Sequence, residues 1–212
     1  MAVLHSLYPS SPNVKIIKEV AQALIAGALV IYPTDTVYAL GCLSSNYKAL
    51  GRLAKLKKVK VEQAPFSFLF ADMSELSNYV QQFDSSTFRI LKRTLPGPFT
   101  YIMKGTRKLP KPFDKRKSIG IRISDDPILK VLLPLLPAPL ITTSLHDKDQ
   151  IIDYTTDPEV IFEEWSSAVD VMIETGAGGN QPSTVIDLTD GEPVVVRIGK
   201  GDVDFCKKKR PL

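Results

Sequence analysis

The fold of this chain is decided by the stretch Val30-Ile31-Tyr32-Pro33-Thr34-Asp35-Thr36-Val37-Tyr38-Ala39-Leu40-Gly41-Cys42. An apolar run at residues 29–32, bounded by Gly27 and Pro33, favours a buried strand over a helix. A turn rich in hydroxyl side chains follows this strand. Ligands of open α/β sheets lie beyond the carboxyl ends of the strands, so the polar turn predicts a site for a small polar molecule. The alternative is a turn that is stabilised by its own Thr and Asp side chains.

Helical and strand patterns alternate along the rest of the chain. Helices are expected from residue 14 to a stop at Gly27, and at residues 47–58, 85–94, 126–136 and 157–165, with a short one that opens at Ser74. Strands are expected at residues 29–32, 66–70, 99–103, 119–123, 140–143, 169–173, 184–188 and 194–197. Short and long connections between these strands favour an α/β fold with a mixed, twisted sheet.

Length and composition are those of a globular protein, with 212 residues, 44% of them hydrophobic and 24% charged. No repeat or linker divides the chain, so we expect one domain over residues 1–206 and a basic tail over residues 207–212. No apolar stretch reaches the roughly 18 residues of a membrane span, and residues 1–7 lack signal-peptide features. The two cysteines have no metal-ligand spacing. These features predict a cytoplasmic protein without a membrane partner or a metal site.

The net charge of +4 is unevenly distributed. Seven basic side chains and a single acid, Asp114, fall between Lys104 and Lys117, whereas residues 147–196 hold twelve acids and one base. The basic segment predicts an anion-binding surface, and a merely solvated face is the alternative. If this segment contacts RNA phosphates, RNA affinity should fall steeply with added salt.

Familiar catalytic motifs are missing from the sequence. It has no Gly-x-Gly-x-x-Gly, no phosphate-binding Gly-Lys-Ser/Thr loop and no Gly-x-Ser-x-Gly elbow. With His5 and His146 as the two histidines, a histidine-rich metal site is excluded. Any reaction must then depend on hydroxyl and basic side chains, a combination that suits nucleotide chemistry.

Six segments, in order, resemble the YrdC/YciO family, whose best-known members are L-threonylcarbamoyladenylate synthases. They are residues 32–42, 96–100, 118–123, 140–144, 182–187 and 195–197. The pieces Tyr-Ala-Leu-Gly-Cys, Thr-Val-Ile-Asp-Leu-Thr-Asp and Thr-Ser-Leu resemble the YciO branch in particular. The resemblance implies a YrdC-like twisted mixed sheet with flanking helices and a central basic cavity.

The resemblance also implies a reaction, in which ATP, bicarbonate and L-threonine become threonylcarbamoyl adenylate and pyrophosphate. Attack of a carbamate oxygen on the α-phosphate needs positioned cations and hydrogen-bond donors, usually with Mg²⁺, but no protein nucleophile. We therefore expect a threonylcarbamoyl-AMP synthase-like protein of tRNA t6A chemistry, or an enzyme acting on the threonylcarbamoyl group of tRNA. The alternative is an RNA-binding protein of the YciO type that binds tRNA or double-stranded RNA without efficient synthesis.

Site residues are carried over from the matching motifs. The substrate-binding residues, on the threonine side, are Thr34, Thr36 and Tyr38. The nucleotide-binding residues are Lys58, Thr142, Ser144, Ser183, Thr184 and Arg197. The catalytic cations are Lys57, Lys60 and Arg122. For each hydroxyl the alternative is a satisfied group at a strand end.

Two motifs depart from those of the synthases. The Lys-x-Arg of the synthases falls at residues 57–60, where direct alignment places Val59 at the arginine and a one-residue shift places lysine at both positions. Neither alignment keeps the guanidinium fork, so bidentate phosphate binding is lost or weakened. The Ser-x-Asn of the synthases ends here in His146, whose imidazole either replaces the amide donor or has no role. These departures predict weak or altered synthase activity.

Overall fold

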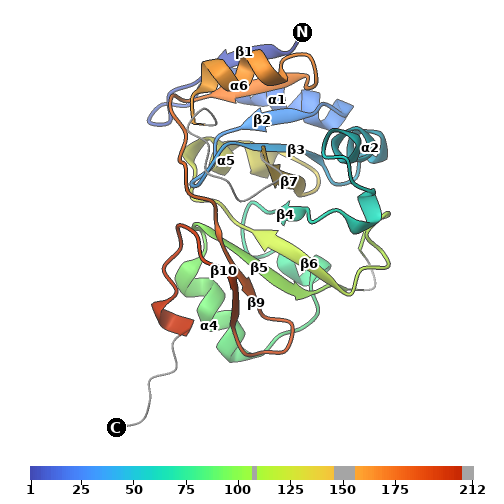
Figure 1. Ribbon diagram of the computed structural model, residues 1–212, viewed down its shortest axis with the longest axis vertical. Coiled ribbons are helices and arrows are strands. Elements are labelled where there is room, and N and C mark those ends of the chain that lie inside the picture. Colours follow the sequence, from blue (N-terminus) through green and yellow to red (C-terminus); the bar gives the residue numbers. More distant parts are fainter. Residues whose placement is uncertain (107–108, 146–155, 207–212) are drawn as a thin grey trace.

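The computed structural model describes residues 1–106, 109–145 and 156–206, so the expected tail lies outside the described residues. Ten strands form one twisted sheet along the molecule, in the order β1-β8-β2-β3-β7-β4-β6-β5-β9-β10 (Figure 1). The strands are β1 (Val3–Ser6), β2 (Val30–Tyr32), β3 (Ala39–Leu43), β4 (Ser67–Leu69), β5 (Phe99–Lys104), β6 (Ser118–Arg122), β7 (Leu140–Ser144), β8 (Val171–Glu174), β9 (Thr184–Asp187) and β10 (Val194–Arg197). The helices are α1 (Val14–Ala26), α2 (Tyr47–Leu56), α3 (Leu76–Tyr79), α4 (Ser85–Thr94), α5 (Pro127–Leu132) and α6 (Pro158–Trp165), with short turns η1 (Val61–Gln63), η2 (Leu133–Leu135) and η4 (Asp204–Cys206). This arrangement confirms the predicted mixed α/β fold.

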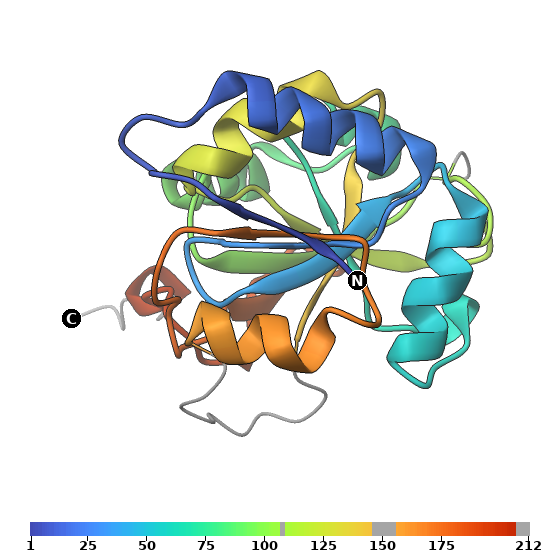
Figure 2. The ribbon, with the colours of Figure 1, turned by 90° about the horizontal axis from the view of Figure 1, so that it is seen from above.

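Helices cover both faces of the half of the sheet that contains β2. α1 and α5 lie together on one face, and α2 and α6 lie on the other (Figure 2). Within β2, Ile31 packs in one apolar cluster, whereas Val30 and Tyr32 pack in the second. Since successive side chains of a strand point to opposite faces, this double cover explains why β2 is apolar at every position.

Helix ends follow the local sequence signals. Asn13 caps the N-terminus of α1, and Gly27 ends the helix with a φ of 103°. Asp126 and Asp157 cap α5 and α6, each with proline in the first turn, as predicted. α5 is shorter than expected because the chain tightens into η2, where Pro134 has no N–H to continue the α-helical pattern. No helix in the described ranges is long and apolar enough to span a membrane.

Two strands were not predicted from the sequence. β1 lies at the edge of the sheet and is mostly exposed, so it lacks the buried pattern that marks a strand. β3 directly follows the polar turn and pairs antiparallel with both β2 and β7. Its Gly41 is required by close packing, because a Cβ there would lie 2.5 Å from Tyr32 Oη and 2.6 Å from the carbonyl oxygen of Ile141.

The buried carboxyl group that caps α5 should make the stability of the protein depend on pH. Asp126 is buried, and its Oδ1 accepts hydrogen bonds from the backbone N–H groups of Ile128 and Leu129. Burial raises the pKa of Asp126 to about 6, with the backbone bonds opposing it and the charge of Asp35 adding to it. A carboxyl whose folded pKa is raised destabilises the fold as pH rises through that pKa. We therefore expect Asp126→Asn, which keeps a capping oxygen, to raise the free energy of unfolding at pH 8 by about 1–2 kcal/mol, and by only about a third as much at pH 4.5, which lies just above the unfolded pKa of about 3.9.

Urea unfolding of both proteins at the two pH values measures this difference. Asp157→Asn is the matched control, because Asp157 caps α6 on the exposed surface. An equal gain at both pH values, or a loss at pH 8, would contradict the assignment to the buried charge of Asp126.

Candidate functional site

A cavity of about 610 Å³ is lined by residues of the neighbouring strands β7, β4, β6, β5, β9 and β10 and of the segments that join them. Its polar lining consists of Tyr38, Lys57, Ser67, Thr100, Arg116, Ser118, Arg122, Thr142, Thr143, Ser144, Asn180, Ser183 and Arg197. Its apolar lining consists of Val37, Val59, Pro65, Phe66, Ile102, Ile119, Leu145, Pro182 and Val185, and Gly120 completes the lining. The described lining thus holds four cationic side chains and no carboxylate, so its charge favours an anion over a cation.

Arg122 is the last residue of β6 and is 8% exposed. Its Nη2 donates to Asp35 Oδ1 and to Thr36 Oγ1, both at 3.1 Å. Burial lowers the pKa of Arg122, and the charge of Asp35 opposes this effect. Arg122 Nε and Asp35 Oδ2 are buried without a hydrogen-bond partner among the described residues. The turn therefore fixes one edge of the guanidinium and leaves donors for a ligand.

Arg197 brings a second guanidinium to the cavity from the end of β10. Its Nη2 donates to the carbonyl oxygen of Ser183 at 2.9 Å. The positive charge of Arg197 also lowers the pKa of Arg122, although its effect is smaller than those of burial and of the Asp35 charge. Arg122 and Arg197 thus repel each other inside a partly desolvated cavity. A bound anion would relieve this repulsion, so the pair favours an anion.

The polar turn holds Arg122 in place more than it lines the cavity. Thr34 Oγ1 donates to the carbonyl oxygen of Val37 at 2.6 Å and accepts from the N–H of Thr36 at 3.1 Å. Neither threonine lines the cavity, although Thr36 contacts Arg122. Tyr38 lines it, but its hydroxyl donates to the carbonyl oxygen of Gly176 at 2.8 Å. Thr34 therefore fits the alternative, a turn that is stabilised by its own side chains. Thr36 instead supports the site through its contact with Arg122, and Tyr38 supports it by lining the cavity.

The glycine-rich segment before β9 packs directly on this turn. A Cβ at Gly178 would lie 2.6 Å from the ring of Tyr38, and a Cβ at Gly179 would lie 1.9 Å from the carbonyl oxygen of Thr36. These glycines therefore allow two backbones to approach beside Arg122, which a larger side chain would prevent.

The lysine-rich segment after α2 divides into lining and exposed residues. Lys57 is 7% exposed, and its Nζ donates to the carbonyl oxygen of Leu145 at 3.0 Å. Val59 lines the cavity beside it. Lys58, with a φ of 53°, and Lys60 are exposed and do not line the cavity. The direct alignment, with Lys57 and Val59 at the two motif positions, is therefore the one that matches the geometry.

The strand-end hydroxyls form part of the cavity floor. Thr142 accepts a hydrogen bond from the buried phenol of Tyr32 at 2.8 Å, and Ser144 lies two residues further on the same strand. Ser183 shares a hydrogen bond of 2.8 Å with Thr100. Thr184 differs, because it is fully buried beneath the cavity and holds the 199–201 loop through Gly199 and Gly201.

Several lining residues were missed in the sequence. Ser118 lies four residues before Arg122 on β6, so strand alternation could have found it. Ser67 pairs in register with Gly120 and Thr142, which only the strand order reveals. Arg116 and Asn180 lie outside the helices and strands, and no periodic signal marks them. His146 lies outside the described residues.

The described lining does not fit a metal held by the protein. Mg²⁺ prefers oxygen ligands from carboxylates, and the described lining residues offer none. Asp35, the carboxylate beside Arg122, is 3.1 Å from Nη2 of that arginine and accepts a hydrogen bond from Ser124 at 2.6 Å. No group of three metal-ligating side chains occurs in the described ranges.

Comparisons with known proteins agree with this geometry. The family model for Sua5, YciO and YrdC proteins, described as telomere recombination, matches residues 22–199. YciO of Escherichia coli K12 is 37% identical over 206 residues, which cover 96% of this chain and 98% of that protein. The crystal structure of E. coli YciO matches with a TM-score of 0.86, covering 96% of this chain and 98% of that chain at 36% identity.

Two further proteins connect this fold to named activities and ligands. A putative threonylcarbamoyl-AMP synthase of Methanocaldococcus jannaschii is 31% identical over 186 residues, which cover 87% of this chain and 86% of that protein. The crystal structure of P. abyssi Sua5 complexed with L-threonine matches with a TM-score of 0.83, covering 93% of this chain and 58% of that chain. At 23% identity, the likeness to Sua5 concerns the fold.

Proposed function

Because the chain belongs to the Sua5/YciO/YrdC family, we propose that its cavity binds ATP and L-threonine and performs threonylcarbamoyl-adenylate chemistry. The observation that carries this proposal is the pair Arg122 and Arg197, which converge on a cavity without a carboxylate in its described lining. A volume of about 610 Å³ also lies within the usual range of small-molecule sites. The synthase name of the M. jannaschii relative supports the same reaction.

The proposed reaction needs positioning rather than a protein nucleophile. The amine of L-threonine adds to bicarbonate with loss of water, which gives a carbamate. A carbamate oxygen then forms a bond to the α-phosphorus of ATP, and the bond between that phosphorus and the bridging oxygen breaks, so that pyrophosphate leaves with the electron pair. Arg122 and Arg197 would stabilise the charge on the phosphates, and hydroxyls such as Thr142 and Ser183 would orient the substrates. Mg²⁺ would enter with the phosphates of ATP, without a described carboxylate ligand.

Pyrophosphate release by the purified protein tests this function. Release should depend on all three substrates, ATP, L-threonine and bicarbonate. Release from ATP alone, or none at any substrate concentration, would contradict the synthase reaction. In the second case, release of threonylcarbamoyl groups from modified tRNA would assign the cavity to a different reaction of the same chemical group.

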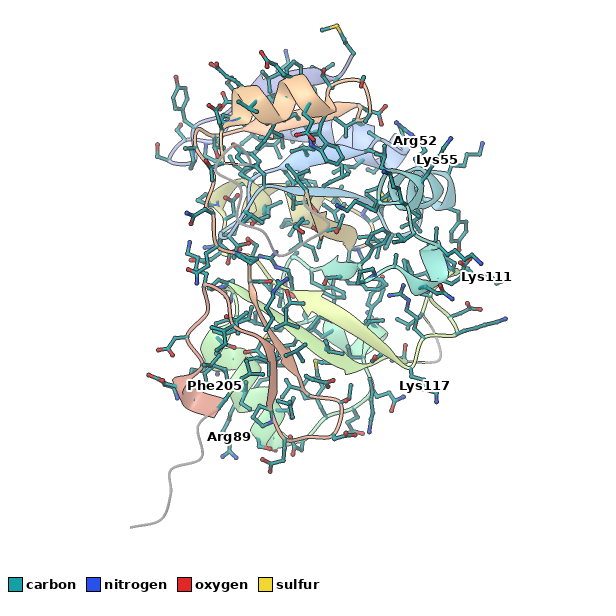
Figure 3. All side chains as sticks on the ribbon, in the orientation of Figure 1. Arg52, Lys55, Arg89, Lys111, Lys117 and Phe205 are labelled. Carbon is teal, nitrogen blue, oxygen red and sulfur yellow. The ribbon has the colours of Figure 1, made fainter. Side chains whose placement is uncertain are left out.

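RNA binding is a second candidate, favoured by an exposed basic strip. The strip is formed by the side chains Arg52, Lys55, Lys58, Lys60, Lys111, Lys115 and Lys117. Four of its members, Arg52, Lys55, Lys111 and Lys117, lie along one side of the molecule (Figure 3). An RNA backbone held there by phosphate contacts would run beside the cavity, next to the lining residue Val59.

We expect the double substitution Lys115→Ala with Lys117→Ala to reduce the salt dependence of tRNA binding. Each phosphate contact contributes about 0.7–0.9 to the steepness of log K against log salt, so loss of two contacts should reduce it by up to about 1.8. Arg116 stays unchanged, because its guanidinium binds backbone carbonyls. The matched control replaces Arg89 and Lys92, two exposed cations of α4, with alanine. Equal slopes in the strip variant, the control and the parent would mean that the strip is only a solvated surface.

A further inference from the structure

Arg116 binds the segment of residues 57–66, which forms one wall of the cavity through Lys57, Val59, Pro65 and Phe66. Arg116 Nε donates to the carbonyl oxygen of Glu62 at 3.1 Å, and Nη2 donates to the carbonyl oxygens of Val61, at 3.1 Å, and Ala64. Arg116 therefore connects the loop before β6 to the wall.

The aromatic ring of Phe113 packs against the guanidinium of Arg116. The guanidinium carbon lies 4.8 Å from the ring centroid of Phe113, a distance at which a cation and an aromatic face attract. Phe113 is fully buried and contacts the ring of Phe68 edge-on at 5.2 Å. Arg116 is thus pre-positioned, so little side-chain entropy remains to be lost when a ligand binds.

One nitrogen of this guanidinium is left for a ligand. Nε and Nη2 of Arg116 are engaged with backbone, whereas Nη1 makes no hydrogen bond to the described residues. Arg116 also lines the cavity on the same wall as Val59. An arginine stays charged even when burial lowers its pKa, as burial does here, so Nη1 offers a charged donor.

The wall of residues 57–66 contains no arginine of its own. Val59 presents an aliphatic side chain to the cavity, and Lys57 directs its Nζ to the carbonyl oxygen of Leu145. Arg116 binds the backbone two to five residues beyond Val59, at Val61, Glu62 and Ala64. A guanidinium from another segment of the chain is therefore bound to this wall, a few residues beyond Val59.

We propose that Arg116 determines specificity for a phosphorylated ligand, by supplying through Nη1 the guanidinium contact that the wall lacks at Val59. The inference rests on the proposed binding of a nucleotide in this cavity, and it assigns the phosphate end of that nucleotide to the wall of residues 57–66. A single donor nitrogen replaces a fork, so the contact selects for phosphate with modest strength.

Calorimetric titration with ATP, adenosine and inorganic tripolyphosphate tests the proposal. Arg116→Ala should weaken ATP and tripolyphosphate binding about fivefold and change adenosine binding less than twofold. Arg116→Gln keeps an amide donor for the backbone carbonyls, removes the charge, and should weaken ATP binding similarly. Arg89→Ala, at an exposed arginine of α4 that does not line the cavity, is the matched control and should bind all three ligands like the parent.

A rescue experiment separates phosphate binding from wall support. Adding Val59→Arg to Arg116→Ala returns a guanidinium to the wall without restoring the three backbone hydrogen bonds. ATP affinity should return to within about twofold of the parent, while the melting temperature should stay at that of Arg116→Ala. Equal losses of ATP and adenosine binding in Arg116→Ala, or no rescue by Val59→Arg, would overturn the proposal and leave Arg116 as a structural clamp.

The two proposals fail in different ways. Tripolyphosphate binding that depends on Arg116, without measurable ATP binding, would keep the anion site and overturn the nucleotide function. ATP binding that does not depend on Arg116 would keep the function and overturn the role of Arg116. A parent protein that binds neither compound would overturn both.

Discussion

Replacing Arg122 with alanine should weaken ATP binding at least about tenfold, which corresponds to about 1.4 kcal/mol of binding free energy. Arg122 is the most buried cation of the cavity after Lys57, and its Nε has no hydrogen-bond partner among the described residues. A phosphate or carboxylate that reaches this guanidinium gains charge-assisted hydrogen bonds in a partly desolvated site. Isothermal titration calorimetry with ATP measures the loss directly.

The control must separate binding from folding, because Arg122 also pairs with Asp35. Removing the guanidinium leaves this buried carboxylate with Ser124 as its remaining side-chain partner, and an uncompensated buried charge is costly. The double variant Arg122→Ala with Asp35→Asn removes both charges and should bind ATP as weakly as the single variant. Arg52→Ala, which breaks a half-exposed ion pair with Asp170, is the matched control for a lost arginine. Unchanged ATP affinity in a folded Arg122→Ala protein would remove Arg122 from the site.

The strand that leads to the site was predictable, because its burial on both faces leaves a visible apolar run. β2 falls within the predicted residues 29–32, and the polar turn after it does reach the cavity through Tyr38. β3 was not predicted, since an apolar strand that contains Gly41 reads as the end of a turn. The reason for this glycine, close contact with Tyr32 and Ile141, exists only once three strands are assembled.

Side chains that come from strand ends were easier to predict than those that come from loops. Arg122 and Arg197 both end apolar strands, and both line the cavity. Arg116 belongs to a run of basic residues, and its sequence gives no reason to separate it from exposed Lys115 and Lys117. Its position depends on the backbone carbonyls of a segment more than fifty residues away.

The departure at Val59 shows what geometry adds to a motif. The sequence left two alignments of the lysine-rich segment open, and both gave a plausible pair of side chains. The left-handed backbone at Lys58, with a φ of 53°, turns the chain so that Lys57 and Val59 face the cavity while Lys58 and Lys60 face solvent. The position of the missing guanidinium is therefore Val59, and a substitution there can restore it.

We expect Val59→Arg combined with His146→Asn to raise pyrophosphate release that depends on L-threonine and bicarbonate. Val59 lines the cavity and is 37% exposed, so a longer side chain has room to extend along the wall toward the phosphates. His146→Asn restores the amide of the synthase motif two residues after Ser144, at a position outside the described residues. A phosphate contact made in the transition state is worth about 1.5–3 kcal/mol, or roughly ten- to a hundredfold in rate.

The single variants show which change carries the gain. Val59→Arg alone should account for most of it, because a guanidinium adds charge to the phosphate end whereas an amide adds only one neutral donor. Val59→Leu, which enlarges the side chain without charge, is the matched control and should leave the rate unchanged. A gain in the double variant would identify the parent protein as a synthase limited by its phosphate contacts. The double variant could instead show no gain while the parent releases threonylcarbamoyl groups from modified tRNA. That result would mean that the cavity is adapted to a different reaction on the same chemical group. Val59 would then belong to a wall that does not have to bind a triphosphate.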